Sequence, residues 1–325
     1  MKILVTGGAG YIGSQVIKEL NKRGYDTIAY DNLENGHREA VKWGEFVEGD
    51  VGDAKKLEEV FHSYSIDAVM HFAAYIEAPE SVINPRKFYY NNTVNTLNLV
   101  NVMLNCQVRR LIYSSSCAVY GEPIAIPMAE DHPFQPINPY GQSKLLVEKV
   151  LPDYDRAYGL KFISFRYFNA AGADPEAGLG ENHHPETHLI PLVFEAALGK
   201  RKTMIIYGDD YDTPDGTCIR DYIHISDLAL AHVLGLEKLF NNPLSDVFNL
   251  GNGLGYSVKE VIQTVRLVTG ADFPVAIAPK RDGDVSRLVG SSRKAIKELG
   301  WQPHYPELKS IIQSVWDYHK LKKIA

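Results

Sequence analysis

Residues 1–13 read MKILVTGGAGYIG, a short β-branched run that leads directly into a glycine-rich segment. Residues 3–6 are typical of a buried strand, and residues 11–23 follow a helical pattern that Gly24 closes. The glycines between them let the backbone approach a phosphate group, and the start of the helix offers free N–H donors. A glycine pattern alone also fits a plain turn. Strand, glycine loop and helix in this order predict a binding site for a dinucleotide pyrophosphate.

The same alternation of strand and helix continues through the first half of the chain. Further strands are expected at 27–31, 68–72, 110–115 and 161–166, and long helices at 86–106 and 140–158. Pro152 is expected to kink or split the last helix. Repeated β-α-β units predict an α/β fold with a doubly wound parallel sheet of the Rossmann type.

The character of the sequence changes after about Gly172. Gly, Pro, His and Asp crowd residues 173–191 and again 208–217, which favours a lid or a binding region over the core of a sheet. We therefore expect a dinucleotide-binding domain at 1–172 and a smaller α/β substrate-binding domain at 173–325. Segments near 220–250, above all 246–250, are expected to return to the main sheet.

The composition is that of an ordinary globular protein. The chain has 325 residues, of which 45% are hydrophobic and 23% charged, and its net charge of -6 gives no general attraction to nucleic acid or acidic membranes. Neither is expected as a partner, so an anionic ligand must be held by individual arginines. The three cysteines lack metal or redox spacing, and the first apolar run is too short for a signal peptide. These features predict a protein of the cytoplasm.

Acidic residues at the ends of the early strands indicate which dinucleotide is bound. Asp31 ends the second strand, where a carboxylate accepts hydrogen bonds from an adenosine ribose and repels a 2′-phosphate. Arg38 lies in the same loop and favours the phosphorylated form, and Asp31 also fits a simple turn residue. Asp50 and Val51 follow the third strand, where an adenine edge can be read. We expect NAD rather than NADP.

Tyr140 and Lys144 lie four residues apart and therefore on one face of the predicted helix. A nearby ammonium group favours the phenolate form of tyrosine and lowers its pKa. A surface tyrosine and lysine on a helix also produce this pattern by chance. Ser114, Ser115 and Ser116 at the end of a preceding strand make it more specific. We expect Tyr140 to act as a general acid and base.

With these motifs in place, the sequence resembles the UDP-galactose 4-epimerases of the extended short-chain dehydrogenase family over nearly its whole length. Dehydratases of that superfamily carry an Asp-Glu pair where this chain has Cys117 and Ala118. The matching segments are TGGAGYIG, YDNL, GD, HFAA, SSSCAVYG, NPYGQSK, FRYFNAAGA, THLIPL, GDDYDTPDGTCIRDYIH and APKRDGD.

This resemblance implies an NAD-dependent isomerase that interconverts UDP-glucose and UDP-galactose through a 4-keto sugar. Ser116 would bind the sugar 4-hydroxyl, Tyr140 would remove its proton and Lys144 would hold the nicotinamide ribose. The implied cofactor contacts are Gly7, Gly10, Tyr11, Ile12, Gly13, Asp31, Asn32, Asn35, Gly36, Asp50, Val51, Phe72, Ala73, Ala74, Asn92, Ser114, Tyr140, Lys144, Tyr167 and Phe168. The implied substrate contacts are Ser116, Tyr140, Asn169, His188, Leu189, Ile205, Tyr207, Arg220, Arg281, Asp284 and Leu288.

The resemblance also implies a homodimer built on the helices at 86–106 and 140–158. Ile76 departs from a lysine found near the cofactor in many relatives, and His188 departs from an asparagine. Leu288 stands where some relatives place a tyrosine against the sugar C2 substituent. A 4-epimerase of another UDP-sugar (N-acetylated, pentose or uronate) and a non-catalytic NAD sensor remain as alternatives.

One further cluster attracts a metal-binding interpretation. Its members are Glu181, His183, His184, Glu186 and His188. Their spacing lacks H-E-x-x-H, the stretch is loop-like and the expected chemistry needs no metal, so no metal is predicted.

Overall fold

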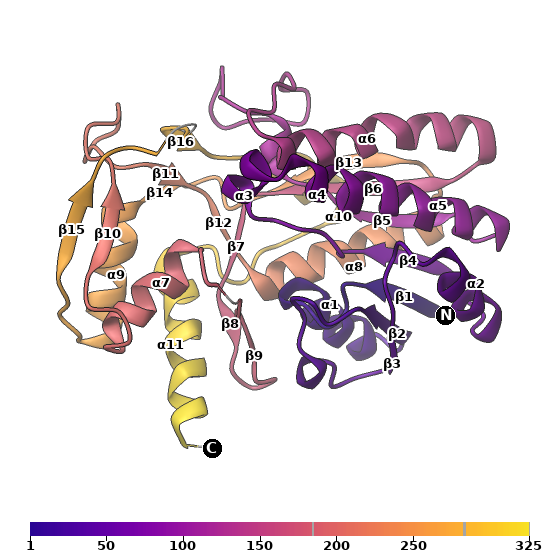
Figure 1. Cartoon of the computed structure of the whole chain (residues 1–325), viewed down its shortest axis with the longest axis horizontal. Coiled ribbons are helices and arrows are strands. Elements are labelled where there is room, and N and C mark those ends of the chain that lie inside the picture. The colour runs from indigo at the N-terminus through magenta and orange to yellow at the C-terminus, as the bar shows by residue number, and fades with distance from the viewer. Residues whose placement is uncertain (184, 282–283, 325) are drawn as a thin grey trace.

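A seven-stranded parallel sheet forms the framework of the computed structural model, which describes residues 1–183, 185–281 and 284–324 (Figure 1). Its order is β13-β6-β5-β4-β1-β2-β3, and every neighbouring pair is parallel. This arrangement confirms the predicted doubly wound Rossmann sheet. The strands are β1 (Lys2–Thr6), β2 (Asp26–Asp31), β3 (Glu45–Glu48), β4 (Ala68–His71), β5 (Arg110–Ser114), β6 (Lys161–Tyr167) and β13 (Asp246–Leu250).

Helices cover both faces of this sheet, because successive strand residues point to opposite sides. On β1, Ile3 and Val5 belong to one core cluster, while Leu4 belongs to the other. The first cluster is closed by α1 (Tyr11–Lys22), α8 (Ile225–Asn241) and α10 (Arg293–Leu299). The second is closed by α2 (Ala54–Ser63), α5 (Thr96–Asn105) and α6 (Pro139–Tyr158).

Two expectations about long helices need correction. Of the kink or split expected at Pro152, the split does not occur, because α6 runs through Pro152 as one helix. A proline removes a single backbone donor, and the buried neighbours Val147 and Leu151 anchor the helix on the sheet. The expected helix at 86–106 is instead α4 (Pro85–Phe88), a π-helical segment (Tyr89–Asn95) and α5.

The second half builds a separate core with elements that the sequence analysis largely missed. In it α7 (Leu189–Ala197), α9 (Val258–Thr269) and α11 (Leu308–Ile324) pack together with the parallel pair β10 (Met204–Tyr207) and β15 (Val275–Ala278). Short strands form small additional sheets, of which the first one named below joins the two halves. They are β7 (Asn169–Ala171) with β12 (Tyr222–His224), β8 (Ala173–Asp174) with β9 (Leu179–Gly180), and β11 (Ile219–Arg220) with β14 (Tyr256–Ser257) and β16 (Arg287–Leu288).

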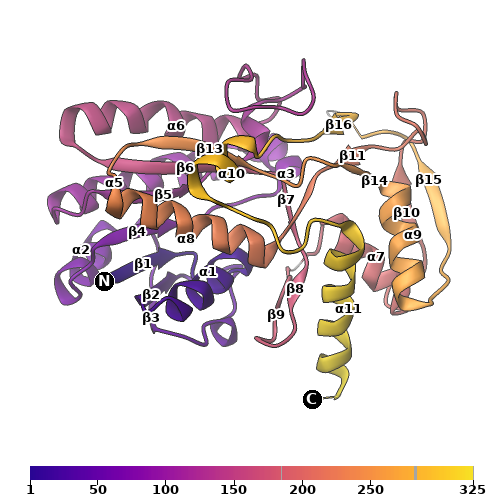
Figure 2. The ribbon, with the colours of Figure 1, turned by 180° about the vertical axis from the view of Figure 1, so that it is seen from behind.

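The chain crosses between the halves more than once. After β12 it forms α8 on the sheet, and β13 then pairs with β6 in register from Asp246 opposite Ile163. Figure 2 shows α8 and β13 among the elements of the first half. Among the helices that the structure describes, none combines the length and apolar character of a membrane span.

Buried histidines make the stability of this fold dependent on pH. Burial lowers the pKa of His71 to about 3 and those of His224 and His232 to about 4. His232 lies on α8 with its Nδ1 2.8 Å from the Leu228 carbonyl oxygen, and its Nε2 has no hydrogen-bond partner. An unfolded histidine titrates near pH 6.5, so between about pH 6.5 and pH 4 the unfolded chain binds more protons than the folded one. Stability therefore falls as pH falls through this window.

We expect His232→Phe to reduce this acid sensitivity. A shift from 6.5 to about 4 corresponds to about 2 kcal/mol of folding free energy lost at pH 5 relative to a non-titrating side chain. Urea unfolding at pH 7 and pH 5 measures the difference in each variant. If the wild type and His232→Phe lose the same free energy of unfolding between pH 7 and pH 5, His232 does not titrate on unfolding in this range.

Candidate active site

A cleft of about 980 Å³ opens at the carboxyl ends of the sheet strands and reaches into the second half. In parallel α/β sheets this edge is the usual place for ligands. The cleft is lined by residues that directly follow or end β1, β2, β4, β5 and β6, together with residues of α7, β10, β11 and β16. Every predicted site residue lines it except Asn92. Asn92 lies behind the wall, where its Nδ2 donates to the Tyr75 carbonyl at 2.9 Å.

The glycine loop is shaped for close approach of a ligand. A Cβ at Gly13 would lie 2.1 Å from the Gly7 oxygen, and one at Gly7 would lie 2.6 Å from Ala73 N. Gly10 precedes α1 without a side-chain cap, so the first N–H groups of the helix stay available. Tyr11 donates its hydroxyl to the Gly172 carbonyl oxygen at 2.6 Å and thus fixes the loop to the segment where the two halves join.

Two backbone N–H groups fix the position of the Asp31 carboxylate beside this loop. Its carboxylate accepts from Ala9 N at 3.0 Å and from Leu33 N at 2.9 Å, while burial raises its pKa. Arg38 turns away and places its guanidinium 4.5 Å from the centre of the Phe46 ring. Arg38 therefore does not pair with Asp31, which agrees with NAD.

A second carboxylate orders the adjoining loop. Asp50 accepts from Asn32 Nδ2 at 2.7 Å and from Gly52 N at 2.7 Å. Tyr75 donates to Glu34 at 2.6 Å across the mouth of the cleft. Tyr75 and Glu34 line the cleft but were not predicted, because no local spacing relates them.

Ser116, Tyr140 and Lys144 all line the cleft, and the Ser116 side chain lies within hydrogen-bond reach of Tyr140. Ser116 precedes a short helical turn and accepts from Ala118 N at 3.1 Å. Tyr140 and Lys144 share one face of α6, whose first turn is capped by Asn138 through Gly141 N at 2.9 Å. Lys144 Nζ donates to the Ser114 carbonyl oxygen at 2.8 Å.

Burial dominates the protonation of this group in the chain without ligands. It lowers the pKa of Lys144 to about 7, an effect that Glu148 partly offsets. It also raises the pKa of Tyr140 above its usual value, although Ser116 lowers it in part. The predicted activation of Tyr140 therefore needs positive charge near its hydroxyl in the liganded enzyme.

A buried ion pair supports the serine segment from behind. Glu148 on α6 accepts from Arg166 Nε at 3.0 Å and from Arg166 Nη2 at 2.5 Å, and both side chains are 5% exposed. The Ser115 hydroxyl donates to the same carboxylate. The pair thus ties α6 to β6 and to the residue before Ser116.

The far end of the cleft carries two arginines around one carboxylate. Arg281 Nε donates to Asp284 at 2.9 Å, and Arg220 Nη2 lies 3.8 Å from the same side chain. Arg220 also donates to the Val285 carbonyl oxygen at 2.7 Å. Arg281 lies over the Tyr207 ring, 4.8 Å from its centre. Asp282 and Gly283 of the APKRDGD segment lie outside the described residues.

The remaining predicted substrate residues approach from several short elements. Ile205 and Tyr207 face the cleft from β10, while the alternate residues Met204 and Ile206 are buried in the core of the second half. Asn169 Nδ2 donates to the Asp221 oxygen at 2.8 Å. Leu288 on β16 lines the cleft, and its other side packs on the cluster of Val119, Tyr120, Met128, Leu145 and Phe168.

His188 lines the cleft, and its ring also pairs with two acidic side chains. It precedes Leu189, the first residue of α7, but its Nδ1 is directed at two carboxylates rather than into the cleft. The distances are 2.9 Å to Glu181 and 3.0 Å to Glu186. Although burial lowers the pKa of His188, hydrogen bonds to these two carboxylates raise it to about 10.

Comparison with known proteins agrees with this geometry. The model of the NAD dependent epimerase/dehydratase family matches residues 3–251.

The chain belongs to the NAD-dependent epimerase/dehydratase family.

Individual relatives extend the match over nearly the whole chain. A protein of Halalkalibacterium halodurans named UDP-glucose 4-epimerase is 50% identical over 98% of this chain and 96% of its own length. The structure of UDP-glucose 4-epimerase from Bifidobacterium longum in complex with NAD+ and UDP is 39% identical, with a TM-score of 0.93 and 98% of each chain covered. The UDP-Glc/GlcNAc 4-epimerase of Campylobacter jejuni is 45% identical, with a TM-score of 0.85 and coverage of 98% and 99%. Because the chain belongs to this family, its cofactor is NAD.

Proposed function

We propose that this epimerase interconverts UDP-glucose and UDP-galactose by oxidising and then reducing C4 of the sugar. The observation that carries the proposal is the meeting of Ser116, Tyr140 and Lys144 in one cleft with the glycine loop and the arginine pair. The names of the full-length relatives support the same reaction.

Ser116, Tyr140 and Lys144 have distinct roles in this reaction. Ser116 binds the 4-hydroxyl, and Tyr140 takes its proton as C4 is oxidised and returns a proton as C4 is reduced. Lys144 holds the nicotinamide ribose and adds positive charge beside the phenol. Bound NAD supplies reversible hydride transfer, and its oxidised ring brings the further positive charge that favours the phenolate.

The uridine diphosphate is held at the other end of the cleft. Arg220 and Arg281 bind the diphosphate, because guanidinium groups form paired hydrogen bonds with phosphate oxygens. Asp284 binds the uridine ribose. Firm binding there leaves the 4-keto sugar free to present its opposite face before reduction. In this division residues 1–172 and the returning segments hold the cofactor, while residues 173–325 hold most of the substrate.

We further propose a cytoplasmic homodimer that pairs α6 and the helices before it with their symmetry mates. Exposed apolar side chains on these helices support the interface. Ile83 is 85% exposed and Tyr90 62% exposed, and Val82 and Val94 lie on the same stretch. Apolar side chains that are gathered in this way on adjacent helices are typical of a contact surface.

Light scattering at micromolar concentration should give twice the 36.3 kDa of one chain. Tyr90→Asp combined with Val94→Asp should shift the mass toward the single chain, because two charges would be buried in the interface. Leu267→Asp, a change at an equally exposed site on α9, should leave the dimer intact. A wild-type mass of 36.3 kDa would rule the dimer out.

A wider sugar range is supported by Leu288. Its side chain lines the cleft and lacks the ring and hydroxyl reach of tyrosine, so the wall stands back at the sugar. The relative from Campylobacter jejuni carries both glucose and N-acetylglucosamine in its name. We propose that this epimerase also accepts UDP-N-acetylglucosamine.

Leu288→Tyr should remove the activity on UDP-N-acetylglucosamine while sparing UDP-glucose. Added bulk in a tight site costs about 1–3 kcal/mol, which is roughly 5- to 150-fold in kcat/KM for the acetylated sugar alone. The two kcat/KM values in both variants measure the change, with Leu254→Tyr as an exposed control. A wild-type enzyme with no turnover of the acetylated sugar would overturn this wider range.

The proposed function is tested by assaying purified chain and NAD against a panel of UDP-sugars. We expect conversion of UDP-galactose to UDP-glucose, with weaker or no activity on UDP-pentoses and UDP-uronates. Retained NAD binding without turnover of any UDP-sugar would favour the non-catalytic sensor instead.

A further inference from the structure

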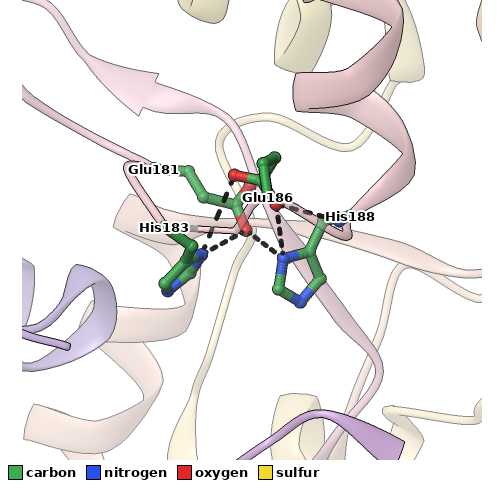
Figure 3. Close-up of side chains that lie close together, drawn as sticks. All are labelled: Glu181, His183, Glu186 and His188. Atoms are coloured by element: carbon green, nitrogen blue, oxygen red, sulfur yellow. Dashed lines mark hydrogen bonds and ion pairs between the residues drawn. The ribbon is translucent and has the colours of Figure 1, made fainter. Parts of the chain in front are cut away.

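Four side chains from one loop point toward a common centre at the edge of the cleft. The loop runs from β9 to α7, and the side chains are those of Glu181, His183, Glu186 and His188 (Figure 3). Each offers one nitrogen or carboxylate oxygen, and these four atoms lie within 4.8 Å of one another. His184, which the sequence places in the same run, lies outside the described residues.

The distances between these atoms are near those between the ligands of a small tetrahedral ion. His188 Nδ1 lies 2.9 Å from Glu181 and 3.0 Å from Glu186, and His183 Nδ1 lies 3.4 Å and 3.9 Å from the same carboxylates. Zinc bonds to nitrogen and oxygen of about 2.0–2.2 Å place tetrahedral ligands about 3.2–3.6 Å apart. Side-chain rotations within the loop must bring the more distant atoms, which are up to 4.8 Å apart, about 1 Å closer to meet that geometry.

The chemistry of the donors also calls for a cation. Carboxylate oxygens and neutral imidazole nitrogens all present lone pairs, so they repel one another unless protons or a positive ion lie between them. Among the described residues, neither Glu181 nor Glu186 pairs with a lysine or arginine. His183 Nδ1 is buried and makes no hydrogen bond. When a metal displaces the proton of His188, two carboxylates and two neutral imidazoles carry a charge of −2, which a divalent ion neutralises.

We propose that Glu181, His183, Glu186 and His188 form a structural site for a divalent transition metal, with zinc as its best match. Two nitrogen and two oxygen donors in a closed tetrahedral set suit zinc better than magnesium or calcium, which prefer six or more oxygens. The absence of H-E-x-x-H argues only against a catalytic metal on a helix. A loop site has no such spacing requirement.

The site lies where a bound metal would link two sides of the cleft. Asn182, inside the loop, presents its carbonyl oxygen to His37 Nε2 at 2.9 Å, and His37 belongs to the loop that follows Asp31. At the other end, His188 directly precedes α7, whose first residue Leu189 lines the cleft. A bound ion would therefore fasten the substrate side of the cleft to the cofactor side.

The test is the metal content of untagged chain, which does not depend on epimerase activity. After chelator treatment and incubation with zinc alone, dialysed wild-type chain should retain about one zinc per chain by mass spectrometry. His183→Gln and Glu181→Gln should each lower retained zinc at least tenfold. Cobalt in place of zinc should give the strong visible absorption of a tetrahedral ion, and the variants should lose it.

His62→Gln provides the matched control, because His62 is exposed on α2 and far from the loop in sequence. It should retain zinc like the wild type. Far-UV circular dichroism of each variant separates loss of the site from loss of the fold. If the folded wild type retains no more zinc than folded His183→Gln, the cluster is an imidazolium–carboxylate network and the metal site is ruled out.

Discussion

Tyr140→Phe should lower kcat for UDP-galactose at least ~100-fold while leaving the fold and NAD binding nearly intact. Tyr140 lies in the cleft beside Ser116, and burial raises its pKa in the chain alone. Phenylalanine fills the same space but cannot accept or return a proton. General acid–base groups typically contribute 10²- to 10⁴-fold, so the loss belongs in kcat rather than in KM.

Tyr158→Phe is the matched control, since Tyr158 is 55% exposed at the far end of the same helix. It should retain wild-type turnover. Steady-state kinetics on both variants, with NAD content measured by fluorescence, make the comparison. Turnover of Tyr140→Phe near that of Tyr158→Phe would remove Tyr140 from the reaction.

Glu148→Leu should destabilise the protein by about 3–5 kcal/mol, because it leaves the buried Arg166 charge without its partner. The hydrogen bonds of Arg166 to the Tyr120 hydroxyl and the Glu130 carbonyl oxygen, each at 2.9 Å, would remain, but neither acceptor is charged. Ser115 also loses its acceptor, so the segment that carries Ser116 should loosen. Urea unfolding gives the change in free energy, and kcat reports the effect on the site.

The exposed pair of Arg156 and Asp153 on the same helix offers a control. Both partners are more than 70% exposed, and such a pair contributes about 0–1 kcal/mol, so Asp153→Leu should change little. Combining Glu148→Leu with Arg166→Met should recover part of the lost stability, since no buried charge remains. Equal losses of unfolding free energy in Glu148→Leu and Asp153→Leu would show that the buried pair contributes no more to stability than the exposed pair.

The features predicted well from the sequence are those confined to one element or to neighbouring elements. The glycines of residues 7–13 and the pair of Tyr140 and Lys144 have spacings that a helix or a strand–helix turn converts directly into geometry. The parallel sheet follows for the same reason, because repeated β-α-β units leave few arrangements. The residue-level roles in the cleft stay predictions until variants are measured.

What the sequence analysis missed depends on contacts between distant segments. β10 pairs with β15, about seventy residues later, and no local pattern announces that pairing. Pro152 carries a strong local signal for a break, yet packing of α6 on the sheet keeps the helix continuous. The Glu181–His188 loop illustrates the same limit, because its four side chains converge only through the fold of a segment without regular periodicity.

The central claim is reversible oxidation at C4 with return of the same hydrogen. UDP-galactose that carries deuterium at C4 tests this most directly, with purified chain and NAD in ordinary water and the product analysed by NMR. We expect UDP-glucose that retains the deuterium at C4, because the hydrogen leaves as hydride and is delivered back to the opposite face. Replacement of the label by solvent hydrogen, or no conversion of UDP-galactose at all, would contradict it.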